Sequence, residues 1–144
     1  MNLSDYRLMA QEDLLIDETQ LNIESSRTPQ IHSKYLNFLM DEKLKLAKSQ
    51  SDFKIIKKKK WLYYTGKISE EELREEQWEP FELSVLKTDI DKFLEADDDI
   101  QLISSKLKYA EVVVEYLESV IKIINNRQWN IRAVIDWLKF TNGQ

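Results

Sequence analysis

The chain has 144 residues, enough for one domain with a hydrophobic core. It contains two glycines, two prolines and no cysteine, which argues against a β-sandwich or an α/β fold and excludes disulfides and thiolate metal sites. The net charge of -5 conceals a segregation, because residues 43–67 carry nine basic and one acidic side chain, whereas residues 68–99 carry three and thirteen.

Few turn-forming residues imply long elements, so we expect an all-α protein, an elongated bundle of long helices. The first helix signals are weak. Ser4 and Asp5 are expected to cap a short helix that ends near Ile16, and a second weak start lies at residues 17–19.

A stronger start follows at Thr28 and Pro29. Proline tolerates the first helical position, and threonine can accept hydrogen bonds from the free amides of the first turn. Apolar residues then recur at roughly helical spacing up to Gly66. This pattern predicts one long helix over about residues 29–64.

The end of this helix carries the most unusual part of the chain, residues 54–67, called the basic segment below. Four consecutive lysines spread over about 300° of a helix, so no single face can bury them. Aromatic rings follow at once, where exposed bases could stack on them. The alternative is a solvated charged turn whose aromatics enter the core. The candidate nucleic-acid-binding residues are Lys54, Lys57, Lys58, Lys59, Lys60, Trp61, Tyr63, Tyr64 and Lys67.

Two further helices are predicted within the acidic block, residues 68–99. Ser69 and Glu72 form a capping-box pattern at the start of a helix over residues 69–76. After Pro80, apolar residues at helical spacing predict a helix over residues 81–96. The three aspartates at 97–99 are expected to cap the helix that follows.

That next helix, over residues 99–125, carries an unbroken seam of apolar residues in steps of three and four. Additional apolar residues widen the seam, so the helix is expected to pack on the long helix or on another subunit. The seam consists of Ile100, Ile103, Leu107, Ala110, Val114, Leu117, Ile121 and Ile124.

Asn125 and Asn126 are expected to end this helix, leaving a short C-terminal helix over residues 128–140. It is apolar on almost every side, which favours self-association; the alternative is a helix inserted into the bundle core. We therefore divide the chain into a helical bundle domain, residues 1–126, and an oligomerisation helix, residues 127–144. The candidate oligomerisation residues are Trp129, Ile131, Val134, Ile135, Trp137 and Leu138.

The sequence offers little material for catalysis. His32 is the single histidine, no glycine-rich phosphate loop occurs, and the acidic runs lack the spacing of a calcium loop. We expect a protein that is not an enzyme and has neither metal nor cofactor. It has no membrane-length apolar stretch and no signal-peptide pattern, so we expect it to be soluble and intracellular.

Four short segments share one family's pattern, in the same order along the chain. Residues 58–67 are similar to a basic-x-basic-x-x-Tyr-Tyr-Ser-Gly-basic stretch, residues 16–21 to Ile-Asp-x-Thr-x-Leu, and residues 33–37 to Ser-Lys-aromatic-Leu-Asn. Residues 127–132 are similar to Arg-x-aromatic-x-Ile-basic, whereas residues 68–82 match poorly. The chain thus resembles the UvsY family, the recombination mediator proteins of T-even-like bacteriophages.

The resemblance implies a helical, ring-forming homo-oligomer, a hexamer or heptamer, in the cytoplasm of the host cell. It implies binding to single-stranded DNA, help in displacing the phage single-stranded-DNA-binding protein, and loading of a RecA-like recombinase in recombination, repair and replication. Lys58 and Lys60 would occupy DNA-contacting positions, and the C-terminal segment would serve assembly. Trp61 stands where the family has leucine, which favours strand binding if its ring is exposed and leaves open that it joins the core.

The charge segregation is equally compatible with a coiled-coil scaffold or adaptor that does not bind nucleic acid. In that case the lysines of the basic segment would face the acidic block of a neighbouring subunit. An inhibitor that mimics DNA has less support, since its carboxylates would have to be spaced along one groove.

Overall fold

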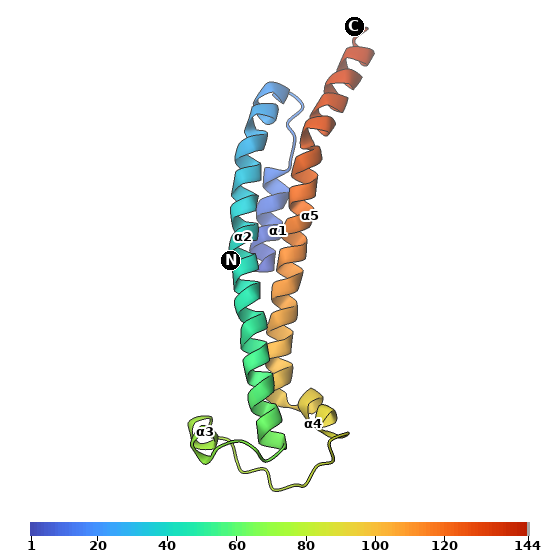
Figure 1. The fold of residues 1–144 in the computed structure, drawn as a ribbon. Helices are drawn as coiled ribbons and strands as arrows, with labels where there is room; N and C mark the ends of the chain where they lie inside the picture. The colour runs from blue at the N-terminus through green and yellow to red at the C-terminus, as the bar shows by residue number, and fades with distance from the viewer. Residues whose placement is uncertain (144) are drawn as a thin grey trace. The chain divides into compact units, whose positions relative to one another are not determined.

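The computed structural model describes residues 1–143, and over these residues it is helical without strands, which confirms the predicted fold class (Figure 1). The helices are α1 (Leu3–Asp13), α2 (Leu21–Tyr64), α3 (Glu70–Glu75), α4 (Ile90–Ala96) and α5 (Asp98–Thr141). None of the helices in this part of the chain is long and apolar enough to cross a membrane.

The chain forms two compact units. Unit 1 consists of Met1–Leu44 together with the chain from Glu111 onward, and unit 2 of Lys45–Ala110. These units do not coincide with the expected boundary at residue 126. An assembly role for residues 127–144 therefore remains a prediction that this division does not address.

In unit 1, α1 lies alongside the first half of α2 and the middle of α5 (Figure 1). The N-cap of α1 is Asn2, two residues before the expected cap at Ser4: Asn2 accepts a hydrogen bond from the Asp5 amide at 2.9 Å, and its own amide donates to the Asp5 carboxylate. Buried tyrosines keep partners for their hydroxyls: Tyr6 donates to Glu42 at 2.8 Å and Tyr35 to Asp13 at 2.9 Å. The apolar core of this unit is Tyr6, Ala10, Ile31, Tyr35, Leu39, Val113, Val114, Leu117, Val120, Ile124 and Ile131.

The helix α2 begins at Leu21, so the predicted start at Thr28 and Pro29 is wrong. Pro29 lies inside the helix and has no N–H to donate to the carbonyl of Ser25. The side chain of Gln128, from α5, donates to that carbonyl instead, at 3.1 Å. The hydroxyl of Thr28 points back along the helix and donates to the carbonyl of Glu24. A partner about 100 residues away thus allows the helix to continue through a proline.

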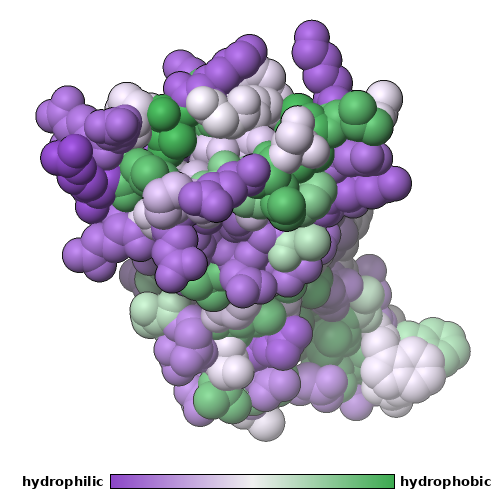
Figure 2. Space-filling model, turned by 90° about the horizontal axis from the view of Figure 1, so that it is seen from below, coloured by the Kyte–Doolittle hydropathy of each residue, from purple (hydrophilic) through white to green (hydrophobic). Residues whose placement is uncertain are grey.

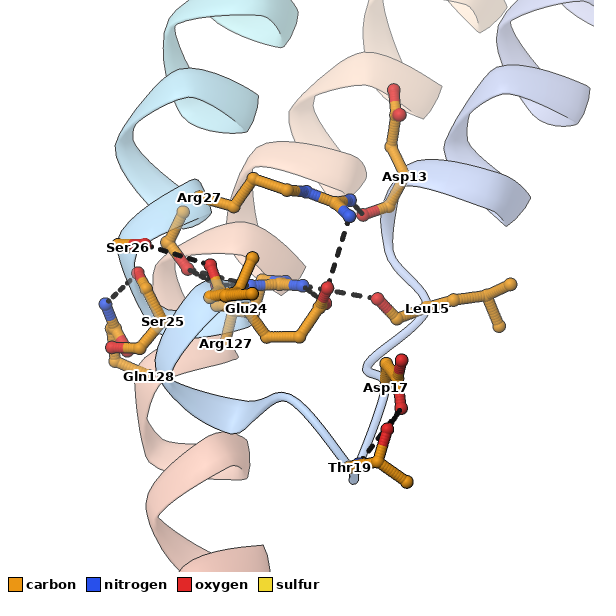
Figure 3. A network of polar contacts seen from close by, with 12 residues as sticks. Asp13, Leu15, Asp17, Thr19, Glu24, Ser25, Ser26, Arg27, Arg127 and Gln128 are labelled. Atoms are coloured by element: carbon orange, nitrogen blue, oxygen red, sulfur yellow. Dashed lines mark hydrogen bonds and ion pairs between the residues drawn. The ribbon is translucent and has the colours of Figure 1, made fainter.

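Arg127 is the centre of the polar network in Figure 3 and is only 1% exposed. Its guanidinium donates to the carboxylate and the carbonyl of Glu24, to the hydroxyl of Thr28, and to the carbonyl of Leu15 at 3.2 Å. It therefore joins α5 to the start of α2 and to the loop after α1. Arg127 was expected in a separate oligomerisation helix; it lies inside unit 1.

The helix α5 continues through Asn125 and Asn126, so the predicted break and the separate short C-terminal helix are wrong. Both asparagines lie on the exposed side of α5. The buried face continues past them in the same steps of three and four, through Leu117, Val120, Ile124, Arg127 and Ile131.

Unit 2 contains the second half of α2, the helices α3 and α4, and the beginning of α5. Two predicted caps are confirmed: Ser69 accepts from the Glu72 amide at 3.1 Å, and Asp97 accepts from the Ile100 amide at 3.0 Å. The predicted helix over residues 81–96 is correct only from Ile90, and residues 78–86 are irregular. Figure 2 shows the end of the molecule that carries α3 and α4, where hydrophobic residues form separate patches among hydrophilic ones.

Candidate nucleic-acid interface

The basic segment forms the last turns of α2 and the reversal after them. Gly66 adopts φ +72°, a conformation that residues with a β-carbon rarely adopt. The amides of Gly66 and Lys67 donate to the carbonyls of Tyr63 and Leu62, at 3.3 and 2.8 Å, which closes the helix in a Schellman motif. The turn brings Lys67 back along the helix, with its ammonium 4.9 Å from the centre of the Trp61 ring.

One part of the segment faces outward. Lys57 and Lys58 lie three and four residues after Lys54 and four and three residues before Trp61, which places all four side chains on one helix face. We call these four residues the outward stripe. The three lysines are exposed, and within residues 1–143 none of them forms an ion pair. The Trp61 ring is 40% exposed, so it does not join the core.

Lys59 lies off this stripe and binds the acidic block. Its ammonium is 2.7 Å from a carboxylate oxygen of Glu76, just after α3, and both side chains are about one-third exposed. This hydrogen bond, together with the negative charge of Glu76, raises the pKa of Lys59. The contact holds the end of α3 against α2.

Lys60 is buried, with 5% of its surface exposed. Its ammonium is 3.1 Å from Asp97 and 2.9 Å from Asp99, and it lies 3.9 Å from the centre of the Trp78 ring. Burial disfavours the charged form, but the hydrogen bonds to Asp99 and Asp97 outweigh it, so the pKa of Lys60 is raised. The resemblance implied a DNA contact at Lys60, yet a strand could reach this ammonium only by breaking both ion pairs.

The two tyrosines of the segment also face inward. Tyr64 donates its hydroxyl to Asp97 at 2.5 Å, and Tyr63 donates to the carbonyl of Glu79 at 2.5 Å. Burial, followed by the hydrogen bond to Asp97, raises the pKa of Tyr64. The tyrosine rings pack on three others, from Trp78, Phe81 and Phe93, with centres 5.0–5.7 Å apart. The tyrosine pair therefore anchors the irregular segment to α2.

The sequence thus identified the segment but not the roles within it. It gave no signal that Asp97, which already caps α5, would also bind Lys60 and Tyr64, because these residues are more than 30 positions apart. Trp78 was likewise missed, although it covers the buried ammonium. The one feature of the sequence that indicated ion pairs for these lysines was the acidic block directly after them.

The candidate oligomerisation residues likewise divide into buried and exposed ones. Ile131 is 2% exposed and belongs to the core of unit 1, whereas Trp129 and Trp137 are 69% and 61% exposed. Val134, Ile135 and Leu138 are partly buried. Phe140, which is 74% exposed, lies 5.8 Å from the Trp137 ring, between ring centres. Large exposed rings this close together are typical of an interaction surface.

Comparison with known proteins gives consistent results. The family model described as "Recombination, repair and ssDNA binding protein UvsY" matches residues 9–144. The chain is 24% identical to Recombination protein uvsY of Enterobacteria phage T4 over 144 residues, which cover all of both chains.

Solved structures are similar as well. The crystal structure of the bacteriophage T4 recombination mediator protein UvsY in lattice type II superposes with a TM-score of 0.86 at 22% identity, covering 99% of this chain and 98% of that chain. The lattice type IV crystal structure gives a TM-score of 0.85 at 22% identity, covering 97% and 99%. At such identity the superposition shows a shared fold.

Proposed function

The chain belongs to the UvsY family of recombination, repair and single-stranded-DNA-binding proteins, and from this premise we propose that it is a recombination mediator that grips single-stranded DNA with its outward stripe. One observation carries the proposal. Lys54, Lys57 and Lys58 are exposed on one helix face with Trp61, and residues 1–143 supply them with no carboxylate partner.

The stripe of one subunit is a modest binder. If its three lysines and Lys67 each neutralise one phosphate, the slope of about 0.7 per phosphate predicts a loss of roughly fiftyfold in affinity between 50 and 200 mM salt. Several stripes in one assembly raise the effective concentration of each, so their weak contacts add up.

The proposal therefore includes a ring-like homo-oligomer, a hexamer or heptamer. Its support is the exposed aromatic surface near the end of α5, where Trp129, Trp137 and Phe140 keep 61–74% of their surface exposed. Covering such rings with a second copy would remove apolar surface from water. Val134, Ile135 and Leu138 would contribute their remaining exposed area.

The full activity that we propose is that of a mediator without chemistry of its own. In the cytoplasm of the host cell, the oligomer would hold an unpaired strand, help to displace the phage single-stranded-DNA-binding protein from it, and load a RecA-like recombinase. The support for these steps is membership of the family.

The test is to change Lys57 and Lys58 to alanine and to measure the binding of a labelled single-stranded oligonucleotide at several salt concentrations. Each substitution should weaken binding and lower the salt slope by about 0.7, because one phosphate contact is lost. Lys122→Ala, at an exposed position of α5 in unit 1, is the matched control and should bind as the unmodified chain does. Equal affinity of Lys58→Ala and the control would contradict the assignment.

A scaffold without DNA binding is the second candidate, and one observation favours it: Lys59 and Lys60 are neutralised by carboxylates. If the remaining lysines were neutralised in the same way by neighbouring subunits, the unmodified protein would show no binding even at 50 mM salt. Measurable binding at that salt excludes the scaffold.

A further inference from the structure

A surface pocket of about 750 Å³ lies beside the outward stripe, between the end of α2 and the irregular segment that precedes α4. Its apolar lining includes Trp61, Leu83 and Val85, and its charged lining is Lys67, Lys87 and Glu82. Neither the family description nor the basic segment identified from sequence accounts for this pocket, and all of these residues belong to unit 2.

We propose that this pocket takes one nucleobase of a single strand, stacked on the Trp61 ring, with Lys67 and Lys87 pairing with the phosphates beside it. The inference rests on the proposed strand binding and gives it a specific subsite. It predicts that the protein distinguishes a strand with bases from a phosphate backbone alone.

Among the aromatics of the basic segment, Trp61 is the one placed to stack. The hydroxyls of Tyr63 and Tyr64 donate to the Glu79 carbonyl and to Asp97, and both rings pack on Phe81. Trp61 keeps 40% of its surface exposed and forms a wall of the pocket. A flat aromatic ring among basic side chains can stack on any base, because every base has a π-face. Such a contact therefore does not depend on the base sequence of the strand.

The charges around the ring suit a nucleotide. The ammonium of Lys67 lies over the Trp61 ring, 4.9 Å from its centre, so it covers one face of the ring. Its flexible four-carbon stem lets it move from the ring to a phosphate when a base arrives. Glu82 lines the same pocket, where its carboxylate can accept a hydrogen bond from an N–H group of the base.

The pocket also continues the outward stripe. Lys57 and Lys58 lie one turn before Trp61 on the same helix face, so a backbone leaving the pocket passes directly to two unpaired ammonium groups. A strand held by its phosphates along the stripe therefore brings a base to the ring without leaving α2.

The test compares oligothymidylate with an abasic strand of the same length, measured by fluorescence anisotropy on the full chain. Trp61→Ala should weaken binding of oligothymidylate about 5- to 150-fold, since stacking contributes about 1–3 kcal/mol per base, and leave binding of the abasic strand unchanged. Trp61→Phe keeps a ring and should retain most of the preference for bases. Lys87→Ala should weaken both strands by a similar factor.

The controls separate this inference from the proposed function. Leu86→Ala changes an exposed side chain of the same irregular segment outside the pocket lining, and it should bind both strands as the unmodified chain does. Circular dichroism of each variant checks that the helices are retained. If Trp61→Ala lowers affinity for both strands equally, or for neither, the base subsite is wrong while strand binding by the stripe stands. If the unmodified chain binds neither strand, the proposed function fails, and the subsite with it.

Discussion

At the scale of single residues, four identical side chains in a row take different roles. Lys57 and Lys58 face water, Lys59 pairs with Glu76 at the surface, and Lys60 is buried between Asp97 and Asp99. Helical rotation of about 100° per residue produces this division, because four successive side chains cannot share an environment. A run of equal charges therefore does not define a binding site until the helix is placed against its neighbours.

Lys60→Ala should destabilise the protein, whereas Lys58→Ala should not. Removing the buried ammonium leaves Asp97, which is itself buried, without its cation, and breaking such a pair lowers the free energy of unfolding by about 3 kcal/mol. Lys58→Ala should change it by less than about 0.5 kcal/mol. Urea denaturation followed by circular dichroism measures both. Equal midpoints would show that the Lys60 ion pairs are not part of the folded state in solution.

Acid should weaken the same site. The pKa of Asp97 lies below its ordinary value of 3.8, because hydrogen bonds from Tyr64, the Ile100 amide and Lys60 outweigh the effect of burial, which alone would raise it. A carboxyl group whose pKa is lowered by folding contributes stability in full above 3.8, and this contribution is lost as the pH falls through the lowered value. Burial alone would raise the pKa of Asp13, but hydrogen bonds from Lys34 and Tyr35 outweigh it and lower this pKa as well. Asp13 therefore also contributes stability that is lost in acid.

The thermal midpoint is therefore expected to fall between about pH 4 and pH 2. Asp97→Asn should be less stable at pH 7 and should show a smaller fall with acid, whereas Asp91→Asn, at an exposed position of α4, should follow the unmodified chain. A parallel acid profile for Asp97→Asn would mean that Asp97 is not linked to folding.

At the scale of helices, the proline inside α2 is tolerated because α5 replaces what it removes. Pro29→Ala restores the missing amide donor and should raise the free energy of unfolding by about 2 kcal/mol. This is the cost of a proline inside a helix, reduced by the stabilisation that proline gives when it restricts the unfolded chain. Gln128→Ala removes the side-chain donor on α5 and should lower the free energy of unfolding by about 1 kcal/mol.

The effects of these two substitutions on the free energy of unfolding should not be additive. Once Pro29→Ala supplies an amide for the carbonyl of Ser25, that carbonyl no longer depends on Gln128, so Gln128→Ala should cost less in this background. A double-mutant cycle by urea denaturation measures the difference. The same cost in both backgrounds would disprove the compensation.

How far the sequence predicts the helices depends on the distance over which each signal acts. Three local signals were reliable: Gly66 ended α2, and Ser69 and Asp97 capped α3 and α5. The expected cap of α1 was misplaced, since Asn2 and not Ser4 is its N-cap. The start of α2 follows the weaker of the two start signals, at residues 17–19, because the stronger proline signal was overridden by Gln128, far along the chain.

Two further errors, the predicted break in α5 and the predicted helix before α4, have related causes. Asparagine in a helix costs only about 0.7 kcal/mol, less than is gained by burying the next residues of the seam, so α5 continued through Asn125 and Asn126. Before α4, helical spacing of apolar residues was misleading, since Phe81 packs on the two tyrosine rings and Glu79 binds the Tyr63 hydroxyl, which holds the segment irregular. In the candidate interface, the sequence points to the segment as a whole, and the structure separates its exposed lysines from those paired with carboxylates. DNA binding by these residues stays a prediction.

At the scale of the whole molecule, strand binding and self-association are expected to be coupled. Trp129→Ala combined with Trp137→Ala should reduce the mass measured by light scattering and weaken oligonucleotide binding about 10²- to 10⁴-fold through lost avidity. Both rings are mostly exposed, so the folded subunit should persist. Leu44→Ala, an exposed apolar position on α2, is the control. An unchanged mass for the double variant would remove these tryptophans from the contact.

The salt link between Glu24 and Arg127 bears on how the protein is made. The two residues are 103 positions apart, so at about 5–20 residues per second a ribosome needs about 5–20 s to deliver the arginine after the glutamate. Until the chain from Glu111 onward is made, the early helices have no third member to pack on. The subunit can close only after the ribosome has passed position 127, so the aromatic rings that we propose for self-association emerge just as a closed subunit becomes available to use them.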